Sequence, residues 1–581
     1  MNSFFHNGTI LLASFALGAS CASGAVIHVR ADASPGGSGT SWALATNDLS
    51  AALGAAQPGD EVWIARGTYT APGGQIGFSV PSGVRVLGGF TGNESQASAR
   101  PADPQPLVAD PAFDTVLSGE VGAPGPANNS WLIVRMENTG ADTLLERVAI
   151  TGANSPTSAG GLYAFLAAGT VRDCLIVGNT ALQGSGLRVS SPNGLVISGC
   201  NVMDNTAVNG GIGAGMLVDG GTMTVENSLF RGNETDYLGG GMAFTGCNAT
   251  VRDCVIEEGE AVYGGGLYAD GGAVFERCVI RNNNAFSPFD PTGATRGFGG
   301  GIYTKDGPIF RECDIVDNTG VNSGGMANEG TLGSSYYNCR FLRNTSSGGG
   351  GAAAIIQQGT LFAGCLFLGN NAFSSPVMYL RSFPQLSSVT FVNCTVVDNG
   401  TGQAAVNIAG TALVLNSIFR NPGDEFSGNF PGVGWSNVEG YTGGLFNVNA
   451  DPMFVDPPSG DYRLRAGSPC IDAGRNDQVP LDLLDDLAGE FRYLDDPSTI
   501  DSGVGPAPVV DMGAYEFRAT PLPCFGDADN SRSVNFADIT MVLANLGAGG
   551  EPFRPGDASG DGAVNFNDIT IVLANLGSAC S

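Results

Sequence analysis

A six-residue phrase that returns through the middle of the chain restricts its fold more than any other feature. The phrase begins with Cys or Ser, has an apolar residue two places later, and ends on Asn five places after its start. Successive copies are mostly 23–29 residues apart, with one interval of 35. They start at Cys174, Cys200, Ser228, Cys254 (a weaker copy), Cys278, Cys313, Cys339, Cys365 and Cys394, with degenerate copies at Val148 and Ser417. A period in this range indicates a stack of similar structural units.

The residues between the copies predict strands. Short alternating pieces such as residues 222–225 are broken by Gly and Asn, and runs of Gly followed by an apolar residue recur, as at Gly264 and Gly299. No helical period of useful length occurs, and the consensus of leucine-rich repeats is absent. We therefore predict an all-β fold, a right-handed parallel β-helix solenoid with about one repeat in each coil.

Such a coil places equivalent residues in ladders, because stacked coils lie roughly 4.8 Å apart. The repeated Cys and the residue two places later share one face of a strand, which we expect to point inward. The Asn is expected to form an amide ladder at a turn. In-register parallel strands hold their Cβ atoms side by side, which suits a disulfide badly. We therefore expect most ladder cysteines to be free thiols packed as small apolar groups.

The repeat resembles units of the pectin-lyase-like and polymorphic outer membrane protein superfamilies, as the Phe-x-x-Asn segments 230–233 and 367–370 illustrate. The segment 36–69 is similar to the start of many secreted bacterial β-helix proteins. Three later segments resemble the "choice-of-anchor" type end region of such proteins: residues 451–456, 467–474 and 510–517. The resemblance implies a β-helix over residues 26–424 and end coils with that region over residues 425–517.

A second, shorter repeat occupies the C-terminal end. Residues 526–540 and 556–570 are nearly the same, and each is followed by an apolar run. Their oxygen-bearing side chains stand at loop positions 1, 3, 5, 9 and 12, the pattern that calcium needs. The candidate ligand positions are Asp527, Asp529, Ser531, Ser533, Asn535 and Asp538 in copy one, and Asp557, Ser559, Asp561, Ala563, Asn565 and Asp568 in copy two. Because Arg532 replaces the turn glycine, we expect copy one to bind calcium less well.

This pair of loops resembles the dockerin type I module, a duplicated half EF-hand. The resemblance implies a small α-helical calcium-binding module over residues 524–581, joined by a linker at residues 518–523, and a cohesin-like protein as its docking partner. Cys524 and Cys580 stand at the two ends of the module. A disulfide between them would clasp a domain that is too small to bury much core.

Charge and the N-terminal segment restrict partners and location. The net charge of −29 argues against a nucleic-acid partner. Residues 1–25 read as a signal peptide, with an apolar core at residues 10–17 and small residues before position 26; a lipoprotein site at Cys21 is the alternative. No other apolar stretch reaches membrane-spanning length. We expect a secreted protein, extracellular or on the cell surface, with no transmembrane segment in the mature chain.

One group of residues is a candidate sugar site. Alignment of the coils on their glycines stacks Tyr268 with Tyr303 on the outer face and places Asp270, Lys305 and Glu329 beside them. The tyrosines are candidates for glycan binding and the three charged residues for catalysis, since a sugar site needs aromatic faces with a few polar groups. The alternative is an acid–Lys–acid ladder that only ties coils together.

Three functions remain open from the sequence. The first is a calcium-binding β-helix protein that binds polysaccharide or cell-surface partners and docks through its C-terminal module. The second is a polysaccharide-degrading enzyme, a uronate lyase or O-glycosyl hydrolase of the pectin-lyase-like fold. The third is a structural surface protein without a glycan role. The resemblance implies hydrolases with clustered Asp, often with His and Arg-x-Lys, but the body has no His beyond His28 and no Arg-x-Lys.

Overall fold

The computed structural model describes residues 24–576 with several gaps, and it divides into two units. Unit 1 comprises residues 1–274 with 286–291, and unit 2 comprises residues 275–285 with 292–581. The residues outside the description are 1–23, 102–108, 111, 113, 123–124, 158, 287–296, 331, 356–358, 381–386, 401–403, 430, 442, 445, 519–525, 527, 529–533, 548–557, 559–562 and 577–581.

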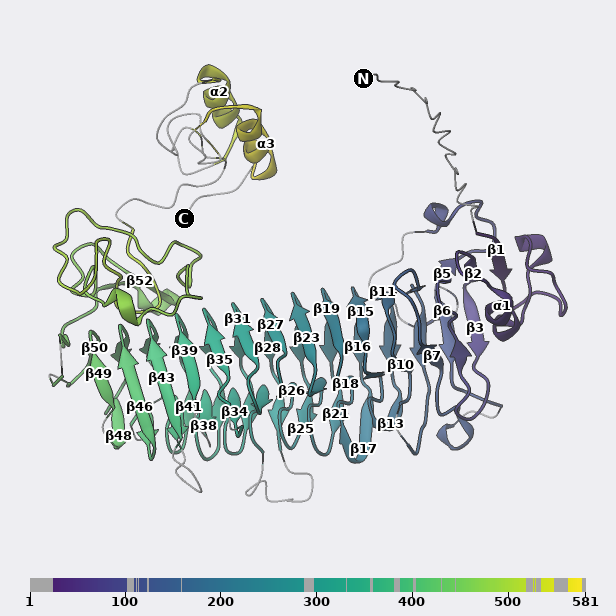
Figure 1. The fold of residues 1–581 in the computed structure, drawn as a ribbon, viewed down its shortest axis with the longest axis horizontal. Helices are drawn as coiled ribbons and strands as arrows, with labels where there is room; N and C mark the ends of the chain where they lie inside the picture. Colours follow the sequence, from purple (N-terminus) through teal and green to yellow (C-terminus); the bar gives the residue numbers. More distant parts are fainter. Residues whose placement is uncertain are drawn as a thin grey trace, which may run out of the picture. The chain divides into compact units, whose positions relative to one another are not determined.

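Both units are built from similar coils (Figure 1). The strands are labelled C, A, B and D by their place in the coil, and the D strand is present only in the coils from β13 to β41. Strands of one place pair in parallel from coil to coil; for example, Ile176 of one B strand is the partner of Val202 in the next. This arrangement is a parallel β-helix, and it confirms the all-β solenoid predicted from the repeat.

The strands of unit 1 fall into four sheets. The A strands are β1 (Val26–Val29), β2 (Glu61–Ala65), β5 (Arg85–Phe90), β8 (Leu144–Glu146), β11 (Gly169–Arg172), β15 (Asn193–Ser198), β19 (Thr222–Glu226) and β23 (Asn248–Arg252). The B strands are β3 (Gly67–Thr70), β6 (Thr115–Ser118), β9 (Ala149–Thr151), β12 (Leu175–Val177), β16 (Asn201–Met203), β20 (Leu229–Arg231) and β24 (Val255–Glu257). The C strands are β4 (Phe78–Ser79), β7 (Val134–Glu137), β10 (Leu162–Phe165), β14 (Leu187–Ser190), β18 (Met216–Asp219), β22 (Met242–Thr245) and β26 (Leu267–Asp270). The D strands are β13 (Thr180–Gln183), β17 (Thr206–Ile212), β21 (Glu234–Thr235) and β25 (Glu260–Ala261).

Unit 2 continues with the same coil and adds an antiparallel pair after it. The A strands are β27 (Val274–Glu276), β31 (Ile309–Arg311), β35 (Ser335–Tyr337), β39 (Thr360–Ala363), β43 (Ser388–Val392), β46 (Thr411–Leu415) and β49 (Gly432–Gly434). The B strands are β28 (Val279–Arg281), β32 (Asp314–Val316), β36 (Arg340–Leu342), β40 (Leu366–Leu368), β44 (Thr395–Val397), β47 (Ile418–Arg420) and β50 (Asn437–Val438). The C strands are β30 (Ile302–Thr304), β34 (Met326–Asn328), β38 (Ala353–Ile355), β42 (Met378–Leu380), β45 (Val406–Ile408) and β48 (Phe426–Gly428). The D strands are β29 (Asn284–Ala285), β33 (Thr319–Gly320), β37 (Thr345–Ser346) and β41 (Asn371–Ala372), and the antiparallel pair is β51 (Phe454–Asp456) with β52 (Asp461–Leu464).

The helices that the structure describes are short. The α-helices are α1 (Leu49–Ala55), α2 (Phe536–Ala544) and α3 (Phe566–Ala574). The 3-10 turns are η1 (Trp42–Leu44), η2 (Ala97–Ala99), η3 (Pro126–Asn128), η4 (Pro457–Ser459) and η5 (Asn476–Gln478). None of these helices is long and apolar enough to cross a membrane.

Each coil bends sharply between its A and B strands, at a place that we call the A–B corner. The residue before the repeated Cys or Ser adopts a left-handed backbone there, with φ near +50° at Asp173, Asn227 and Asn338. Asn and Asp tolerate this region better than other non-glycine residues do. The bend turns the following Cys inward, and Cys174 and Ile176 are both buried as predicted. All cysteines within the described residues are buried free thiols.

The predicted amide ladder runs along the inside of the next bend. In unit 2, Asn318, Asn344 and Asn370 each donate from Nδ2 to the Oδ1 of the following ladder Asn at 2.9–3.0 Å. The ladder continues to Asn421, whose Nδ2 donates to Glu425 at 2.8 Å. Burial raises the pKa of Glu425 to about 7, while the hydrogen bonds from Asn421 act in the opposite direction. The ladder therefore satisfies buried polar groups from coil to coil and ends on a buried carboxyl group.

Aromatic rings form a second ladder in the core of unit 2. Phe275 stacks on Phe310 with ring centroids 4.7 Å apart, Phe310 stacks on Tyr336 at 4.8 Å, and Tyr336 stacks on Phe362 at 5.0 Å. Offset stacking of this kind adds to the free energy gained by burying the rings. The stacked rings and the amide ladder together fix the register of successive coils.

Candidate functional site

The predicted sugar-site residues of unit 1 lie on β26. The hydroxyl of Tyr268 donates to Asp270 Oδ2 at 3.3 Å, and Tyr268 is only 3% exposed. The outward ring face expected for Tyr268 is therefore covered, and this part of the interpretation is wrong. A ring can stack on a sugar only through an open face, so Tyr268 is a poor stacking platform in this arrangement.

The other three members belong to unit 2. Tyr303 of β30 pairs with Ala327 of β34, the register that the glycine alignment predicts, and Tyr303 is 2% exposed. Its expected open ring face is therefore wrong as well. Lys305 and Glu329 directly follow these two paired strands and are both half-buried. Because the five residues are divided between the two units, their grouping into one site stays a prediction, while the open ring faces expected of the two tyrosines are wrong.

A different feature of unit 2 creates a recessed surface. The segment after the coils, residues 439–517, which we call the end region, folds back over the A–B corner. At the corner Asn393 donates to the carbonyl oxygen of Asp511 at 2.9 Å. Asn416 donates to the carbonyl oxygen of Arg475 at 2.9 Å and accepts from its N–H at 2.8 Å. The end region is therefore fastened to the corner by amide side chains that the repeat places there.

The corner residue Gly364 explains how closely the end region approaches. Its φ of +67° favours glycine, and a Cβ at this position would lie 2.1 Å from Asn338 Oδ1, 2.9 Å from Leu483 Cδ1 and 3.3 Å from the Arg492 guanidinium. Leu483 also packs with Ala363 and Val510 in one apolar cluster. A side chain at position 364 would push the end region away from the coils, so glycine permits the contact.

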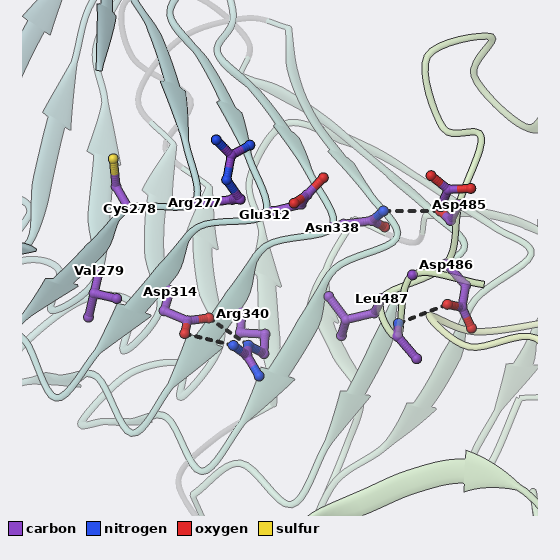
Figure 2. A pocket seen from close by; sticks show the side chains of 12 residues that line it. Arg277, Cys278, Val279, Glu312, Asp314, Asn338, Arg340, Asp485, Asp486 and Leu487 are labelled. Carbon is purple, nitrogen blue, oxygen red and sulfur yellow. Dashed lines mark hydrogen bonds and ion pairs between the residues drawn. The ribbon is translucent and has the colours of Figure 1, made fainter. Parts of the chain in front are cut away.

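A groove of about 460 Å³ opens where the end region leaves the corner (Figure 2). Its near wall consists of successive corner residues Arg277, Glu312 and Asn338, and the loop at residues 485–489 forms the opposite wall. The Asn338 Nδ2 donates across to the carbonyl oxygen of Asp485 at 3.0 Å, which closes one end. The remaining lining residues are Cys278, Val279, Asp314 and Arg340.

An arginine–aspartate pair lies in the groove between neighbouring B strands. Arg340 of β36 binds Asp314 of β32 through two parallel hydrogen bonds of 2.5 and 2.7 Å. The adjacent Asp314 is the first cause of the raised pKa of Arg340. Asp486 on the opposite wall accepts backbone N–H bonds from Ala488 and Glu490 at 2.8 Å each. The groove thus combines guanidinium groups, carboxylates and ordered backbone within one recess.

The loop wall rests on a buried ion pair. Arg492 and Glu516, both with fully buried side chains, lie 3.0 Å apart, and Arg492 also donates to the carbonyl oxygens of Gly513 and Ala514. The backbone N–H of Glu516 in turn donates to Asp486 Oδ2 at 2.9 Å. Burial raises the pKa of Glu516 to about 8, and Arg492 opposes that rise.

The groove is chemically suited to binding a polar polymer. Guanidinium groups recognise carboxylates and hydroxyls with directed, charge-assisted hydrogen bonds. Carboxylates such as Asp314 accept hydrogen bonds from hydroxyls. The successive corner residues are also spaced by coil-to-coil stacking, which suits a repeating ligand better than a compact one.

The C-terminal helices carry the described part of the predicted calcium loops. The described candidates are Asn535, Asp538, Ala563, Asn565 and Asp568, and the other seven lie outside the described residues with Cys524 and Cys580. In each copy the Asn accepts a backbone N–H at the start of the helix, and the Asp accepts the Asn N–H at 2.8 Å. These capping boxes begin α2 and α3.

The apolar residue at loop position 8 packs into the core of the module in both copies. Val534 and Val564 are buried together with Val542 and Val572 in one small core between the two helices. The loop ends are therefore anchored to the helices, which fixes two of the candidate ligands in each copy relative to the core. The predicted calcium ions and the disulfide stay predictions.

The groove itself was not predicted from the sequence. One signal was present, because the residue before the repeated Cys or Ser is Asn at positions 338, 393 and 416. All three bind the end region in the structure. The partners of these asparagines are backbone groups about 60 to 150 residues away in the sequence. The spacing of residues in the repeat does not predict contacts over such separations.

A comparison with protein families agrees with the coil architecture. A family model described as a right-handed β-helix region matches residues 132–315, which is less than half of the chain. No curated protein matches the chain. Among solved structures, the crystal structure of pectate lyase Pel9A is similar at 13% identity and a TM-score of 0.30, over 85% of this chain and 96% of that one. Similarity at that level supports no conclusion about this chain.

Proposed function

We propose that this protein is a secreted β-helix protein that binds polysaccharide in the groove of unit 2 and docks through a calcium-binding C-terminal module. The groove carries the first part of the proposal. It is the place where two arginines, several carboxylates and a rigid loop line one recess along successive coils. A polysaccharide with hydroxyl and carboxylate groups complements such a surface.

The role of Arg340 can be tested by mutation, because Arg343, a second arginine that lies outside the groove, offers a matched control. Arg340 lines the groove and pairs with Asp314, while Arg343 pairs with Asp317 in the same two-bond geometry at 2.7 and 2.8 Å without lining it. Arg340→Ala is expected to weaken polysaccharide binding at least about tenfold, the effect of losing one charge-assisted hydrogen bond. Arg343→Ala is expected to change binding less than twofold.

The measurement is affinity electrophoresis or calorimetry against uronate-containing and neutral polysaccharides. The Arg343→Ala variant controls for loss of a surface ion pair, since exposed pairs of this kind contribute little to stability. Equal binding by wild type and Arg340→Ala would place any glycan site elsewhere. Lys305 and Glu329, the half-buried charged residues of the predicted sugar site in unit 2, would then be the next candidates.

An enzymatic role is the second candidate, and Arg277 in the groove favours it. A lyase needs a basic group near a uronate, and Arg277 lies in the same recess as Arg340. The same incubations should therefore be followed both at 235 nm, for unsaturated products, and for new reducing ends. An increase in either signal would make the protein a lyase or a hydrolase, whereas binding without product formation supports the binding role.

The C-terminal module supplies the docking part of the proposal. Its two helices, each begun by a capping box after a predicted calcium loop, are the support for it. Calcium would draw the carboxylates of each loop together and stabilise the module, because like charges converge only when a cation neutralises them. A cohesin-like protein is the proposed partner of the helix faces.

Loss of a first-position ligand tests the calcium loops. Asp557→Ala is expected to remove the tighter calcium site of the module, and Asp527→Ala to remove a weaker one, because copy one has Arg532 at the turn. Calorimetric titration of the full chain with calcium should show the stoichiometry falling by one in each variant. A combined Asp527→Ala/Asp557→Ala variant that takes up as many calcium ions as wild type would contradict the proposal.

A further inference from the structure

A group of three carboxylates in the end region has no role in the groove. Asp472, Asp495 and Asp501 each bring a carboxylate oxygen within 4.8 Å of the other two. Within the described residues, no ion pair involves any of them. Three carboxylates at this separation repel one another, and the repulsion is stronger where one of them is shielded from water. The arrangement is therefore unfavourable unless a cation neutralises the charges.

The buried member of the group is an independent sign of a missing ligand. Asp472 is 0% exposed, and neither of its carboxylate oxygens makes a well-aligned hydrogen bond among the described residues. Buried carboxylates in folded proteins are almost always hydrogen-bonded, paired or bound to a metal. Burial raises the pKa of Asp472 to about 6, and the carboxylates of Asp501 and Asp495 add to that rise.

The backbone around Asp472 holds it firmly in this position. Its N–H donates to Asp511 Oδ1 at 2.7 Å, and its carbonyl oxygen accepts from Ser502 and Gly503 at 2.9 and 3.0 Å. Its φ of +50° is uncommon for a residue with a side chain. The structure therefore retains an unfavourable backbone and an unpaired carboxylate at the same residue, which is typical of a ligand-binding position.

The loop that carries the other two carboxylates is ordered by its own hydrogen bonds. The Asp496 side chain accepts from the Ser498 hydroxyl and from the Thr499 hydroxyl, both at 2.7 Å. These bonds shape the segment between Asp495 and Asp501, both of which are exposed to water. Water can therefore complete a coordination shell on the open side.

We propose that Asp472, Asp495 and Asp501 form a calcium site that fastens the loop at residues 495–501 to the segment around Asp472, within the end region. Oxygens on opposite sides of a calcium ion lie roughly 4.6–5.2 Å apart, twice the metal–oxygen distance, so all three carboxylates can contact one ion. An all-oxygen set with no His or Cys selects a hard cation, and the open, uneven geometry suits calcium better than the strict octahedron of magnesium. This site is separate from the C-terminal loops and does not depend on the proposed function.

The test uses the full chain with the C-terminal loops disabled by Asp527→Asn, Asp529→Asn, Asp557→Asn and Asp561→Asn. This background is expected to bind one calcium ion per chain in calorimetric titration and to melt at a higher temperature with calcium than with a chelator. Adding Asp495→Asn and Asp501→Asn should abolish both effects. These two side chains are exposed, so the variant should fold, and Asp472→Asn should give the same loss.

The matched control is the background with Asp424→Asn and Asp456→Asn, which removes the same charge from two other exposed acids. This control is expected to retain the calcium ion. The proposal is overturned if the background binds no calcium, or if the Asp495→Asn/Asp501→Asn variant binds calcium as the control does. Magnesium binding as tightly as calcium in the background would overturn the assignment of the ion.

Discussion

Asn370→Ala is expected to lower the free energy of unfolding of unit 2 by about 3–5 kcal/mol, because it interrupts the amide ladder inside the coil. The Asn370 Oδ1 accepts from both the backbone N–H and the Nδ2 of Asn344 at 2.9 and 3.0 Å. Its Nδ2 donates to the carbonyl oxygen of Phe341 at 2.7 Å. The substitution therefore leaves buried donors and an acceptor without partners in a place that water does not reach.

The neighbouring residue provides the control. Asn371 is exposed on β41, so Asn371→Ala removes the same amide group from the same coil without touching the ladder. Urea unfolding followed by circular dichroism should show a large shift of the midpoint for Asn370→Ala and little change for Asn371→Ala. Similar midpoints for the two variants would show that the ladder contributes little to stability.

The coil could be predicted from the sequence because the coils repeat one pattern of residues, each in the same local structure. The Cys, the apolar residue after it and the Asn recur with a spacing that only a stack of strands explains, and the structure buries all three as expected. The register of Tyr303 with Ala327 also follows from aligning the glycines. A ladder is a sum of equivalent nearest-neighbour contacts, so one repeat unit contains the information for the rest.

The burial of the two tyrosines could not be predicted in this way. The strand alternation places Tyr268 and Tyr303 on the face opposite Leu267 and Ile302, but all four side chains are buried. An outward side chain is exposed only when nothing else covers it. What covers a strand face depends on packing across coils, which the period of the sequence does not encode.

The groove and the end region escaped prediction for a related reason. The position of the loop at residues 485–489 depends on the Arg492–Glu516 pair and on the close approach of the end region to Gly364. These three residues lie far apart in the sequence. Buried charges of this kind depend on a single arrangement of partners, and composition gives no hint of it. The resemblance to a known end region indicated that a distinct segment follows the coils, but not where it packs.

Arg492→Met is expected to destabilise the end region by about 3–5 kcal/mol near neutral pH, the usual effect of breaking a buried ion pair from one side. Glu516 and Asp511 would then be buried carboxyl groups without a fully buried cation beside them, and burial raises the pKa of each above its ordinary value. A raised carboxyl pKa in the folded state means that stability is greatest below the unfolded pKa and is lost as the pH rises toward the folded value. The effect of Arg492→Met should therefore be smaller at pH 5 than at pH 8.

This prediction also connects stability with binding. Asp486 on the groove wall is held by the N–H of Glu516, so loosening the Arg492–Glu516 pair should release the loop at residues 485–489. Hydrogen exchange of peptides covering residues 484–517 should rise in Arg492→Met, and polysaccharide binding should fall with it, whereas Arg465→Met, at an exposed arginine of the same region, should change neither. A variant whose end region exchanges like wild type at pH 8 would show that the buried pair is dispensable. Faster exchange with unchanged polysaccharide binding would show that the loop at residues 485–489 is not part of the ligand site. A ligand bound in the proposed groove would lose affinity when this wall of the groove is released.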